Sequence, residues 1–387
     1  MNSSISAFAD VLVVGAGIAG AGAAYELAEF ASVIVLEAES RYGYHATGRS
    51  AASFSENYGN TLVRRLAIGS RSFLSEPPAG FSDHSLLTPR GMITIARSDQ
   101  LFLLERELGF ARALVPTIRS MSRTEAIRRV PILREDYIAG AFFEPDSMEV
   151  DVHALHHGFL RAARHRGARF VANARVNQVE RTGGQWRVEA SQGRFCAPIL
   201  VNATGAWGDE IATISGITPL GLVAKRRTAF NIPVPRDVIT AGWPLVNDVG
   251  DEFYFKPDAG QLFVSPSDAT PCAPMDAYPD DLDVAVGVER LERATTLTVD
   301  HVSHAWAGLR TFAADSSPVV GPDASIASFI WLVGQGGYGI KTSPALSRIC
   351  AALVEQKALP DDLLQLGITA SDLSPNRLQQ AYSIHSH

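Results

Sequence analysis

The sequence contains little cysteine and no closely spaced cysteine pair. Its three cysteines, Cys196, Cys272 and Cys350, are widely separated, and none belongs to a CxxC motif. This spacing argues against a disulfide framework and against a zinc site, so we expect no metal. A chain with so few cysteines suits a reducing compartment, and we expect the protein to lie in the cytoplasm.

Long apolar runs and an excess of positive charge are also missing. No apolar run reaches the roughly 18 residues that a membrane span requires, and the first residues are too polar for a signal peptide. We therefore expect no integral membrane contact; electron transfer to membrane quinones would occur from the inner face. A net charge of -7 disfavours a nucleic-acid partner.

The most informative segment is residues 9–39, ADVLVVGAGIAGAGAAYELAEFASVIVLEAE. Residues 11–14 form a short β-branched run, which is followed by Gly15, Gly17 and Gly20 and then by a helical pattern. In a dinucleotide fingerprint these glycines permit the tight turn, the close approach of backbone to a pyrophosphate and the packing of helix on strand. The pattern predicts strand, turn and helix, with the phosphates at the helix N-terminus.

A second apolar run, residues 32–36, ends in Glu37, whose carboxylate suits ribose hydroxyls and repels a 2'-phosphate. The fingerprint alone does not separate FAD from NAD. Its position before a long chain with no second fingerprint favours a flavoprotein that binds FAD in an extended form.

With 387 residues, 46% of them hydrophobic, the chain is longer than one ordinary domain. We expect an FAD-binding domain made of residues 1–85, 150–218 and 314–387, and a substrate-binding domain made of residues 86–149 and 219–313. Residues 169–181 alternate as one strand, and a helix is predicted from Pro344 to Val354.

Residues 152–166 have the pattern of an amphipathic helix that carries His153, His156 and His157. Because no carboxylate accompanies this HxxHH cluster, we interpret the histidines as part of a helix surface and not as a metal site.

Seven segments recur in a known order and at similar spacing: VVGAGIAGAGAAYEL, GYHATGRSAA, LVNATGAW, PLGLVAKRR, FYFKPDAG, AGLRTF and GQGGYGIKTS. With them the chain resembles the D-amino-acid oxidase superfamily of flavoproteins, most closely the bacterial FAD-dependent D-arginine dehydrogenases. The resemblance covers nearly the whole chain. It implies an α/β fold in which a Rossmann-like, glutathione-reductase-type domain binds FAD noncovalently and interlocks with a substrate domain on a mixed, mostly antiparallel sheet.

The resemblance also implies a reaction, the oxidative deamination of D-amino acids. A hydride passes from Cα to flavin N5, and water then hydrolyses the imino acid to a 2-oxo acid and ammonia. No general base stands out, and none is required if the amine arrives neutral, so orientation is the main task of the protein. The electron acceptor is a quinone or oxygen, and the sequence does not distinguish them.

An amino-acid substrate needs a cation for its carboxylate, and arginine offers a fixed charge and a bidentate fork. By the resemblance, the substrate contacts are Tyr58, Arg227, Tyr254, Arg310 and Gly337, with Met92 and Asn247 as further pocket residues. We assign the catalytic roles to Tyr58, Tyr254 and Arg310. Arg226 stays an alternative to Arg227, because neighbours on a strand face opposite ways.

The expected FAD contacts lie in the fingerprint, in the small-residue loop after it and in the glycine-rich turn near the C-terminus. They are Gly15, Gly17, Ala19, Gly20, Glu37, Ala38, Ala46, Thr47, Gly48, Arg49, Ser50, Ala51, Ala52, Ser53, Val176, Gly205, Gly336, Gly337, Tyr338, Gly339, Ile340 and Lys341. A helix N-terminus after that turn would present donors to the pyrimidine end of the flavin. His45 is an alternative site for a covalent flavin tether.

The chain departs from the D-arginine dehydrogenases where specificity should lie. They carry a glutamate just after the segment matched by residues 88–90, whereas Gly91 follows here, so we expect a preference that is not strictly cationic. Ser53 replaces a histidine and Asn247 an apolar residue. Lys341 replaces a glutamine; its ammonium either reaches the flavin O2/N1 region or faces solvent.

Two other functions stay open. One is a glycine- or sarcosine-type oxidase of secondary amines in the same superfamily. The other belongs to a different class, a flavin-binding sensor or partner subunit without catalysis.

Overall fold

The N-terminal fingerprint begins a six-stranded sheet. In the computed structural model, which describes residues 7–378, its strand order is β10 (Arg169–Val171), β3 (Val33–Leu36), β2 (Val11–Val14), β14 (Ile199–Asn202), β22 (Phe329–Val333) and β21 (Val319–Pro322). Only β21 runs antiparallel to its neighbour. Strands β2, β3 and β22 are buried at every residue, as expected for a parallel sheet with both faces covered.

Different layers cover the two faces of this sheet. On one face Val11, Val13 and Val35 pack against the helices α1 (Ile18–Leu27), α5 (Val152–His165) and α8 (Gly339–Val354). On the other face Leu12 and Trp331 pack against α6 (Gly208–Ile214) and a four-stranded sheet. That sheet consists of β1 (Ala7–Phe8), β13 (Gly193–Ala197), β12 (Gln185–Ala190) and β11 (Val176–Thr182).

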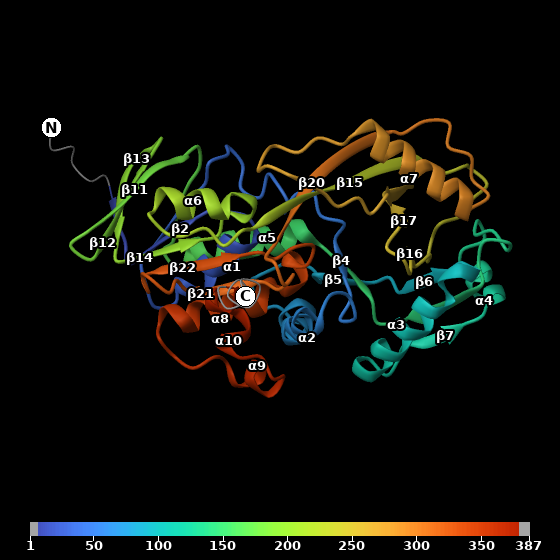
Figure 1. Ribbon diagram of the computed structural model, residues 1–387, viewed down its shortest axis with the longest axis horizontal. Helices are drawn as coiled ribbons and strands as arrows, with labels where there is room; N and C mark the ends of the chain where they lie inside the picture. Colours follow the sequence, from blue (N-terminus) through green and yellow to red (C-terminus); the bar gives the residue numbers. More distant parts are fainter. Residues whose placement is uncertain (1–6, 379–387) are drawn as a thin grey trace, which may run out of the picture.

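A second large sheet has nine strands and lies beside the first (Figure 1). Its order is β19 (Thr270–Cys272), β15 (Val223–Pro233), β18 (Gln261–Ser265), β17 (Tyr254–Asp258), β16 (Leu245–Asp248), β6 (Met92–Ala96), β8 (Gly140–Glu144) and β7 (Arg119–Met121), with β20 (His304–Phe312) paired to β15. The pairing is antiparallel except between β16 and β6. The predicted α/β fold with a mixed, mostly antiparallel second sheet is confirmed.

Helices pack on both faces of the second sheet, and short elements complete the chain. Helix α3 (Leu101–Leu114) lies on one face, and α4 (Arg123–Arg129) and α7 (Asp281–Ala294) lie on the other. A three-stranded sheet of β4 (Ser53–Phe54), β9 (Met148–Val150) and β5 (Leu87–Pro89) joins segments that lead into both large sheets. The remaining elements are α2 (Thr61–Ser75), α9 (Asp361–Gln365), α10 (Ala370–Leu373) and two short 3-10 turns, Ser98–Gln100 and Gly205–Trp207.

The strands of the second sheet come from two separate stretches, residues 92–144 and 223–312. The boundaries between an FAD-binding and a substrate-binding domain given above stay a prediction. Across residues 7–378, every helix is too short or too polar to pass through a membrane.

Two predicted elements are wrong in their bounds. Residues 169–181 do not form one strand, because the chain turns at Asn173, where φ is 54°, and β10 and β11 join different sheets. The last long helix begins at Gly339 and not at Pro344. Pro344 has no N–H to donate to the carbonyl of Ile340, and the Ser343 hydroxyl donates to that carbonyl instead (3.0 Å).

Candidate active site

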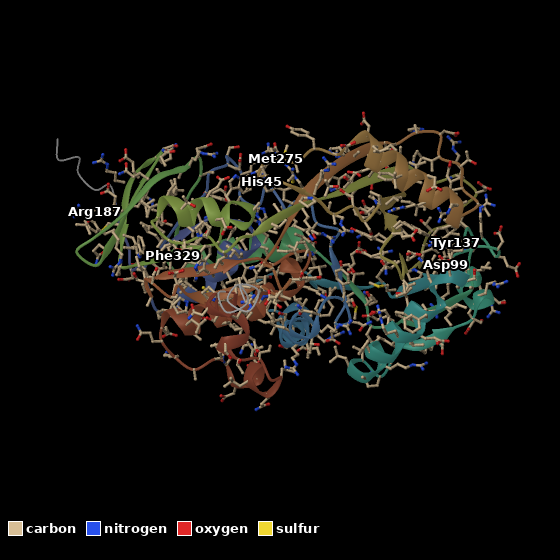
Figure 2. All side chains as sticks on the ribbon, in the orientation of Figure 1. His45, Asp99, Tyr137, Arg187, Met275 and Phe329 are labelled. Atoms are coloured by element: carbon tan, nitrogen blue, oxygen red, sulfur yellow. The ribbon has the colours of Figure 1, made fainter. Side chains whose placement is uncertain are left out.

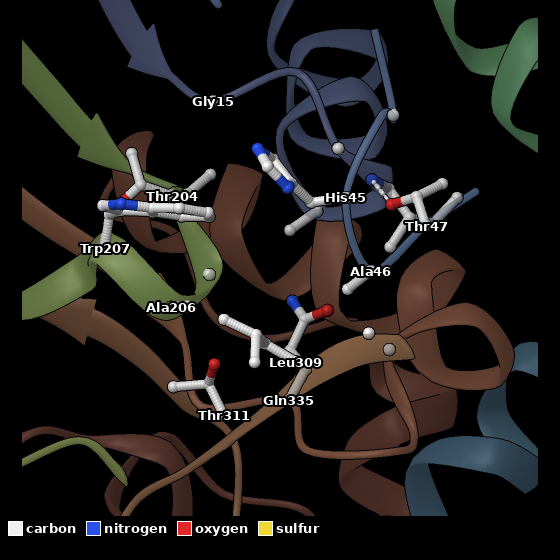
Figure 3. A pocket seen from close by; sticks show the side chains of 18 of the residues that line it. Gly15, His45, Ala46, Thr47, Thr204, Ala206, Trp207, Leu309, Thr311 and Gln335 are labelled. Atoms are coloured by element: carbon white, nitrogen blue, oxygen red, sulfur yellow. Dashed lines mark hydrogen bonds between the residues drawn. The ribbon is translucent and has the colours of Figure 1, made fainter. Parts of the chain in front are cut away.

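An elongated cavity of about 480 Å³ lies between the two large sheets (Figure 3). One end is lined by the β2–α1 loop and by Glu37 and Ala38 after β3. The other end is lined by Arg227, Tyr254 and Arg310 of the nine-stranded sheet and by the turn before α8. Its volume falls in the range of about 300–1,000 Å³ typical of ligand and cofactor sites.

The β2–α1 loop is shaped by its glycines. Gly15 has φ +98°, and a Cβ there would lie 2.6 Å from the carbonyl oxygen of Ala203; a Cβ on Gly20 would lie 1.9 Å from the carbonyl oxygen of Gly15. Helix α1 has Gly17 as its N-cap, with no side-chain cap and no acidic residue in its first turn. Its positive end is therefore directed at the cavity without an acidic side chain in the first turn of the helix itself.

Side chains fix this loop from two sides. The Glu37 carboxylate accepts hydrogen bonds from the backbone N–H of Ala16 (2.8 Å) and of Glu39 (2.9 Å). The Thr47 hydroxyl accepts from the backbone N–H of Ile18 (2.9 Å, Figure 3). The carboxylate that the sequence predicted for a ribose is thus held at the edge of the cavity by the backbone.

His156 supports the same loop from below, which corrects the prediction that all three histidines of α5 lie on a helix surface. It is 4% exposed, and its Nε2 donates to the carbonyl of Ala16 (2.9 Å). Burial lowers the pKa of His156 to about 4, so the ring is neutral at neutral pH. His153 and His157 stack on each other outside (4.1 Å between centroids).

The sequence contains a signal that identifies His156 as an inward-facing residue. Residues 156, 159, 160 and 163 are all buried and follow one apolar face of α5 at helical spacing. A histidine on that face needs a hydrogen-bond partner inside the protein, and Ala16 supplies it.

The loop after β3 is tied to the second sheet. Arg49 pairs with Asp276 (2.5 Å) and donates to the carbonyls of Ala277 and Ala307. His45, labelled in Figure 2, lines the cavity with its Nε2 3.0 Å from a Glu39 oxygen, and the hydroxyl of the adjacent Tyr44 donates to Asp276 (3.1 Å). Segment 275–277 therefore holds the loop against the cavity.

At the opposite end, Arg310 has an unusual environment. Its guanidinium makes long hydrogen bonds to the hydroxyls of Tyr58 (3.4 Å) and Tyr254 (3.5 Å). Within residues 7–378 it makes no ion pair with a carboxylate. A Cβ on Gly337 would lie 2.9 Å from the guanidinium carbon, so only glycine permits this approach.

Arg227 lies on the same face of the sheet as Arg310. On β15 it is opposite Gly308 of β20, which makes Arg310 its diagonal neighbour. Its Nη2 is 3.7 Å from Asp251, while its buried Nε and Nη1 have no hydrogen-bond partner among residues 7–378. Arg226 faces the other way and pairs with Asp283 of α7 (2.8 Å).

Most of the predicted contacts line the cavity. For FAD these are Gly15, Gly17, Ala19, Glu37, Ala38, Ala46, Thr47, Arg49, Ser50, Ala51, Val176, Gly205, Gly336, Gly337, Gly339 and Ile340, and for the substrate Arg227, Tyr254, Arg310 and Gly337. The predicted residues that are not among those lining it are Gly20, Gly48, Ala52, Ser53, Tyr58, Met92, Asn247, Tyr338 and Lys341. Of these, Tyr58 reaches Arg310, Met92 packs against the cluster around Tyr254, and the Asn247 amide donates to the Asp248 carbonyl.

Of the two alternatives for Lys341, the structure excludes the one in which it faces solvent. Its residue surface is 3% exposed, and its ammonium donates to the carbonyls of Ser55 (2.7 Å) and Tyr58 (2.5 Å). Helix α8 is buried along almost its whole length, so its third residue points into the protein.

Several residues that line the cavity are not among the predicted contacts. Thr204 and Trp207 lie on one side of it and Gln335 below His45 (Figure 3). The Gln335 Nε2 is buried without a hydrogen-bond partner. Thr204 and Trp207 belong to the LVNATGAW segment and Gln335 to GQGGYGIKTS, so these motifs already contained them.

The family model described as FAD dependent oxidoreductase (DAO) matches residues 10–353. The chain belongs to this family. A similar relative, the glycine oxidase of Geobacillus kaustophilus (strain HTA426), is 23% identical, and the match covers 93% of this chain and 96% of that protein.

Solved structures share the fold. Glycine oxidase from Geobacillus kaustophilus superimposes with a TM-score of 0.80 at 22% identity, covering 90% of this chain and 95% of that one. L-proline dehydrogenase from P. horikoshii gives 0.81 at 19% identity, with 96% and 98% covered. Iminodiacetate oxidase from Chelativorans sp. BNC1 gives 0.78 at 24% identity, with 94% and 98% covered.

FAD is the cofactor of this family, and the cavity of this DAO-family chain fits it. Helices α1 and α8 both begin at the cavity, and neither has a cap bond from its own N-cap residue or an acidic residue in its first turn. One positive helix end suits the diphosphate and the other the pyrimidine side of a flavin. When bound, the flavin supplies the acceptor for a two-electron oxidation.

Proposed function

We propose that this protein catalyses the FAD-dependent oxidative deamination of amino acids, with D-amino acids of neutral side chain as its main substrates. The FAD is bound noncovalently, the product is an imino acid that water converts to a 2-oxo acid and ammonia, and a quinone or oxygen accepts the electrons. The proposal rests on the D-arginine dehydrogenase resemblance and on the arrangement of charge at one end of the cavity.

The guanidinium of Arg310 is the observation that carries the proposal. A partly buried cation without a carboxylate partner in the described part of the chain is costly unless a ligand supplies the anion. Arg227 adds two unpaired nitrogens on the same face of the sheet. Together they offer forked donors to a substrate carboxylate.

The remaining groups at this end suit the rest of an amino acid. The hydroxyls of Tyr58 and Tyr254 already contact Arg310 and would share the carboxylate with it. The carbonyl of Gly337, which lines the cavity beside Arg310, would accept a hydrogen bond from the amine. The task of these residues is to hold the α-carbon and its hydrogen in a fixed orientation, which contributes to rate without a dedicated base.

The structure gives a physical reason for a neutral side-chain preference. At the position that follows residues 88–90, Gly91 has φ +71°, and a Cβ there would lie 2.9 Å from the Phe143 ring. A glutamate would not fit this turn. The carboxylate of Asp251 lies 3.7 Å from Arg227 Nη2 and is therefore already paired with a cation.

A second candidate is the oxidation of a secondary amine that bears two carboxylates. Arg227 and Arg310 are neighbouring cations on one face of the sheet, and two carboxylates would pair with both. The similar fold of iminodiacetate oxidase, whose name specifies such a substrate, adds support.

Anaerobic mixing with matched substrates tests the proposal. Holoenzyme is mixed with D-alanine, L-alanine, D-phenylalanine, sarcosine and iminodiacetate, and the loss of visible flavin absorbance is followed. We expect the D-amino acids to reduce the flavin and their L-enantiomers not to do so. Reduction by iminodiacetate but not by the D-amino acids selects the second candidate, and no reduction by either contradicts both.

A further inference from the structure

Tyr58 is held in an unusual way for a residue that contacts the substrate end of the cavity. Its side chain is 41% exposed, and it lies between β4 and α2 in a segment without helix or strand. Its hydroxyl nevertheless reaches Arg310. Loops outside helices and strands tend to be mobile. An exposed ring on a loop therefore needs other groups that anchor the loop backbone if it is to hold one position.

The group below this backbone is the ammonium of Lys341. It donates to the carbonyl of Tyr58 itself (2.5 Å) and to that of Ser55 at the start of the same turn (2.7 Å). Two bonds from one ammonium therefore connect the first turn of α8 to both ends of segment 55–58. The adjacent α8 residues Gly339 and Ile340 line the cavity.

Aromatic rings complete the surroundings of the ammonium. Lys341 Nζ lies 5.3 Å from the centroid of the Tyr58 ring and 5.6 Å from that of Tyr338. The two rings meet edge to face, with 5.3 Å between their centroids. The cation thus contacts Tyr58 through its ring as well as through its carbonyl.

A buried carboxyl lies behind this cluster. Glu144 of β8 and Ser55 are each 3% exposed, and the Ser55 side chain hydrogen-bonds to Glu144. Burial raises the pKa of Glu144 to about 7 and lowers that of Lys341 to about 7, because the charged form of each group is poorly solvated there. Burying both groups costs free energy, so the lysine is poorly explained as a mere filler of space.

We propose that Lys341 is a positioning residue that holds the Tyr58 hydroxyl at Arg310 by anchoring the backbone of residues 55–58. The inference rests on the proposed function for the role of Tyr58, but not for the anchoring itself. In this view Lys341 affects substrate binding without contacting the substrate.

The kinetic test is a double-mutant cycle in the holoenzyme with the best substrate of the panel. A hydrogen bond from one hydroxyl contributes about 1 kcal/mol, so we expect Tyr58→Phe to raise KM by up to about tenfold. Lys341→Met keeps the volume but removes the donors; we expect a similar rise in KM, a kcat changed less than about twofold, and no further rise in the double variant. Lys357→Met, at an exposed lysine, is the matched control and should change nothing.

The structural test does not depend on any substrate. In Lys341→Met holoenzyme, amide hydrogen exchange of residues 55–59 should be at least about tenfold faster than in the unchanged protein, with exchange in α5 unaltered. If Lys341→Met does not bind FAD, Lys341→Gln, which keeps a neutral donor, takes its place in both tests. Unchanged exchange, or KM effects that multiply in the double variant, would overturn the inference. If no amino acid reduces the flavin, the proposed function fails while the exchange result still decides the anchoring.

Discussion

The two ends of the cavity treat their polar groups in opposite ways. At the FAD fingerprint, Glu37, Thr47 and His156 all hydrogen-bond to the backbone of residues 16–18 and its neighbours. At the other end, Arg310 has only long contacts to tyrosines, and nitrogens of Arg227 have no partner. At the fingerprint end, hydrogen bonds within the protein satisfy the polar side chains and hold the loop as a frame. At the other end, the arginine donors stay available to a ligand.

The largest effect is expected from removing the free cation. Arg310→Met should lower kcat/KM by about 30- to 5,000-fold, since loss of one partner of a buried charge pair costs roughly 2–5 kcal/mol. The FAD content should stay unchanged, because the fingerprint end is untouched. Steady-state kinetics measures kcat/KM, and the flavin absorbance per protein chain measures the FAD content. Arg310→Lys keeps the charge but not the fork and should recover part of the activity; full activity in Arg310→Met would refute the difference between the two ends.

The stability of the protein at low pH tests how His156 supports the frame at the fingerprint end. The pKa of His156 is about 4 in the folded protein against 6.5 as its ordinary value, so between these pH values the unfolded chain binds more protons. The free energy of unfolding should therefore fall as pH drops from 6.5 to 4, by about 3 kcal/mol in total from this residue. His156→Gln keeps a donor for Ala16 and should flatten this slope.

Urea unfolding of the holoprotein at a series of pH values measures that slope. His153→Gln, on the outer side of the same helix, is the control and should leave the slope as it is. An identical slope in the His156 variant would show that the buried ring does not couple acid to the stability of the frame.

A smaller steric change should weaken the frame without reaching the substrate end. A Cβ on Gly20 would meet the carbonyl oxygen of Gly15 at 1.9 Å, so Gly20→Ala must displace the loop. With an overpacking cost of about 1–3 kcal/mol, FAD affinity should fall roughly 10- to 100-fold, as flavin fluorescence would report. Gly109→Ala in α3, where a Cβ meets nothing within 4 Å, is the control and should bind FAD normally.

The smallest expected effect is the difference in KM between substitutions of the adjacent residues Arg226 and Arg227. Arg227→Met should raise KM by about tenfold through the loss of charge-assisted hydrogen bonds to the substrate. Arg226→Met breaks ion pairs with α7 and should cost about 1 kcal/mol or less of stability, with KM unchanged. Equal KM values in the two variants would show that Arg227 does not bind the substrate.

The two ends of the cavity also differ in how well the sequence predicts their residues. Gly15, Gly20 and Glu37 belong to one strand, turn, helix and strand unit, so their spacing fixes their geometry. Tyr58, Arg227 and Arg310 come from a loop and two strands of another sheet, and no local pattern brings them together. The family segments pointed to Arg227 and Arg310, and only the resemblance as a whole pointed to Tyr58.

Residues such as His156 and Lys341 show a second limit. Spacing predicted the helix of His156 and, from Pro344 onward, the helix that carries Lys341, but not which neighbour each side chain would meet. His156 had a periodic signal on the apolar face of α5. Lys341 had none, because the carbonyls of Ser55 and Tyr58 that bind it lie far away in the sequence.

The central claim is that the substrate end recognises the carboxylate of an amino acid. Its most direct test is anaerobic reduction of the bound flavin by D-phenylalanine compared with phenethylamine, which is the same amine without the carboxylate. We predict rapid loss of visible flavin absorbance with D-phenylalanine and none with phenethylamine. Equal reduction by both would contradict the account.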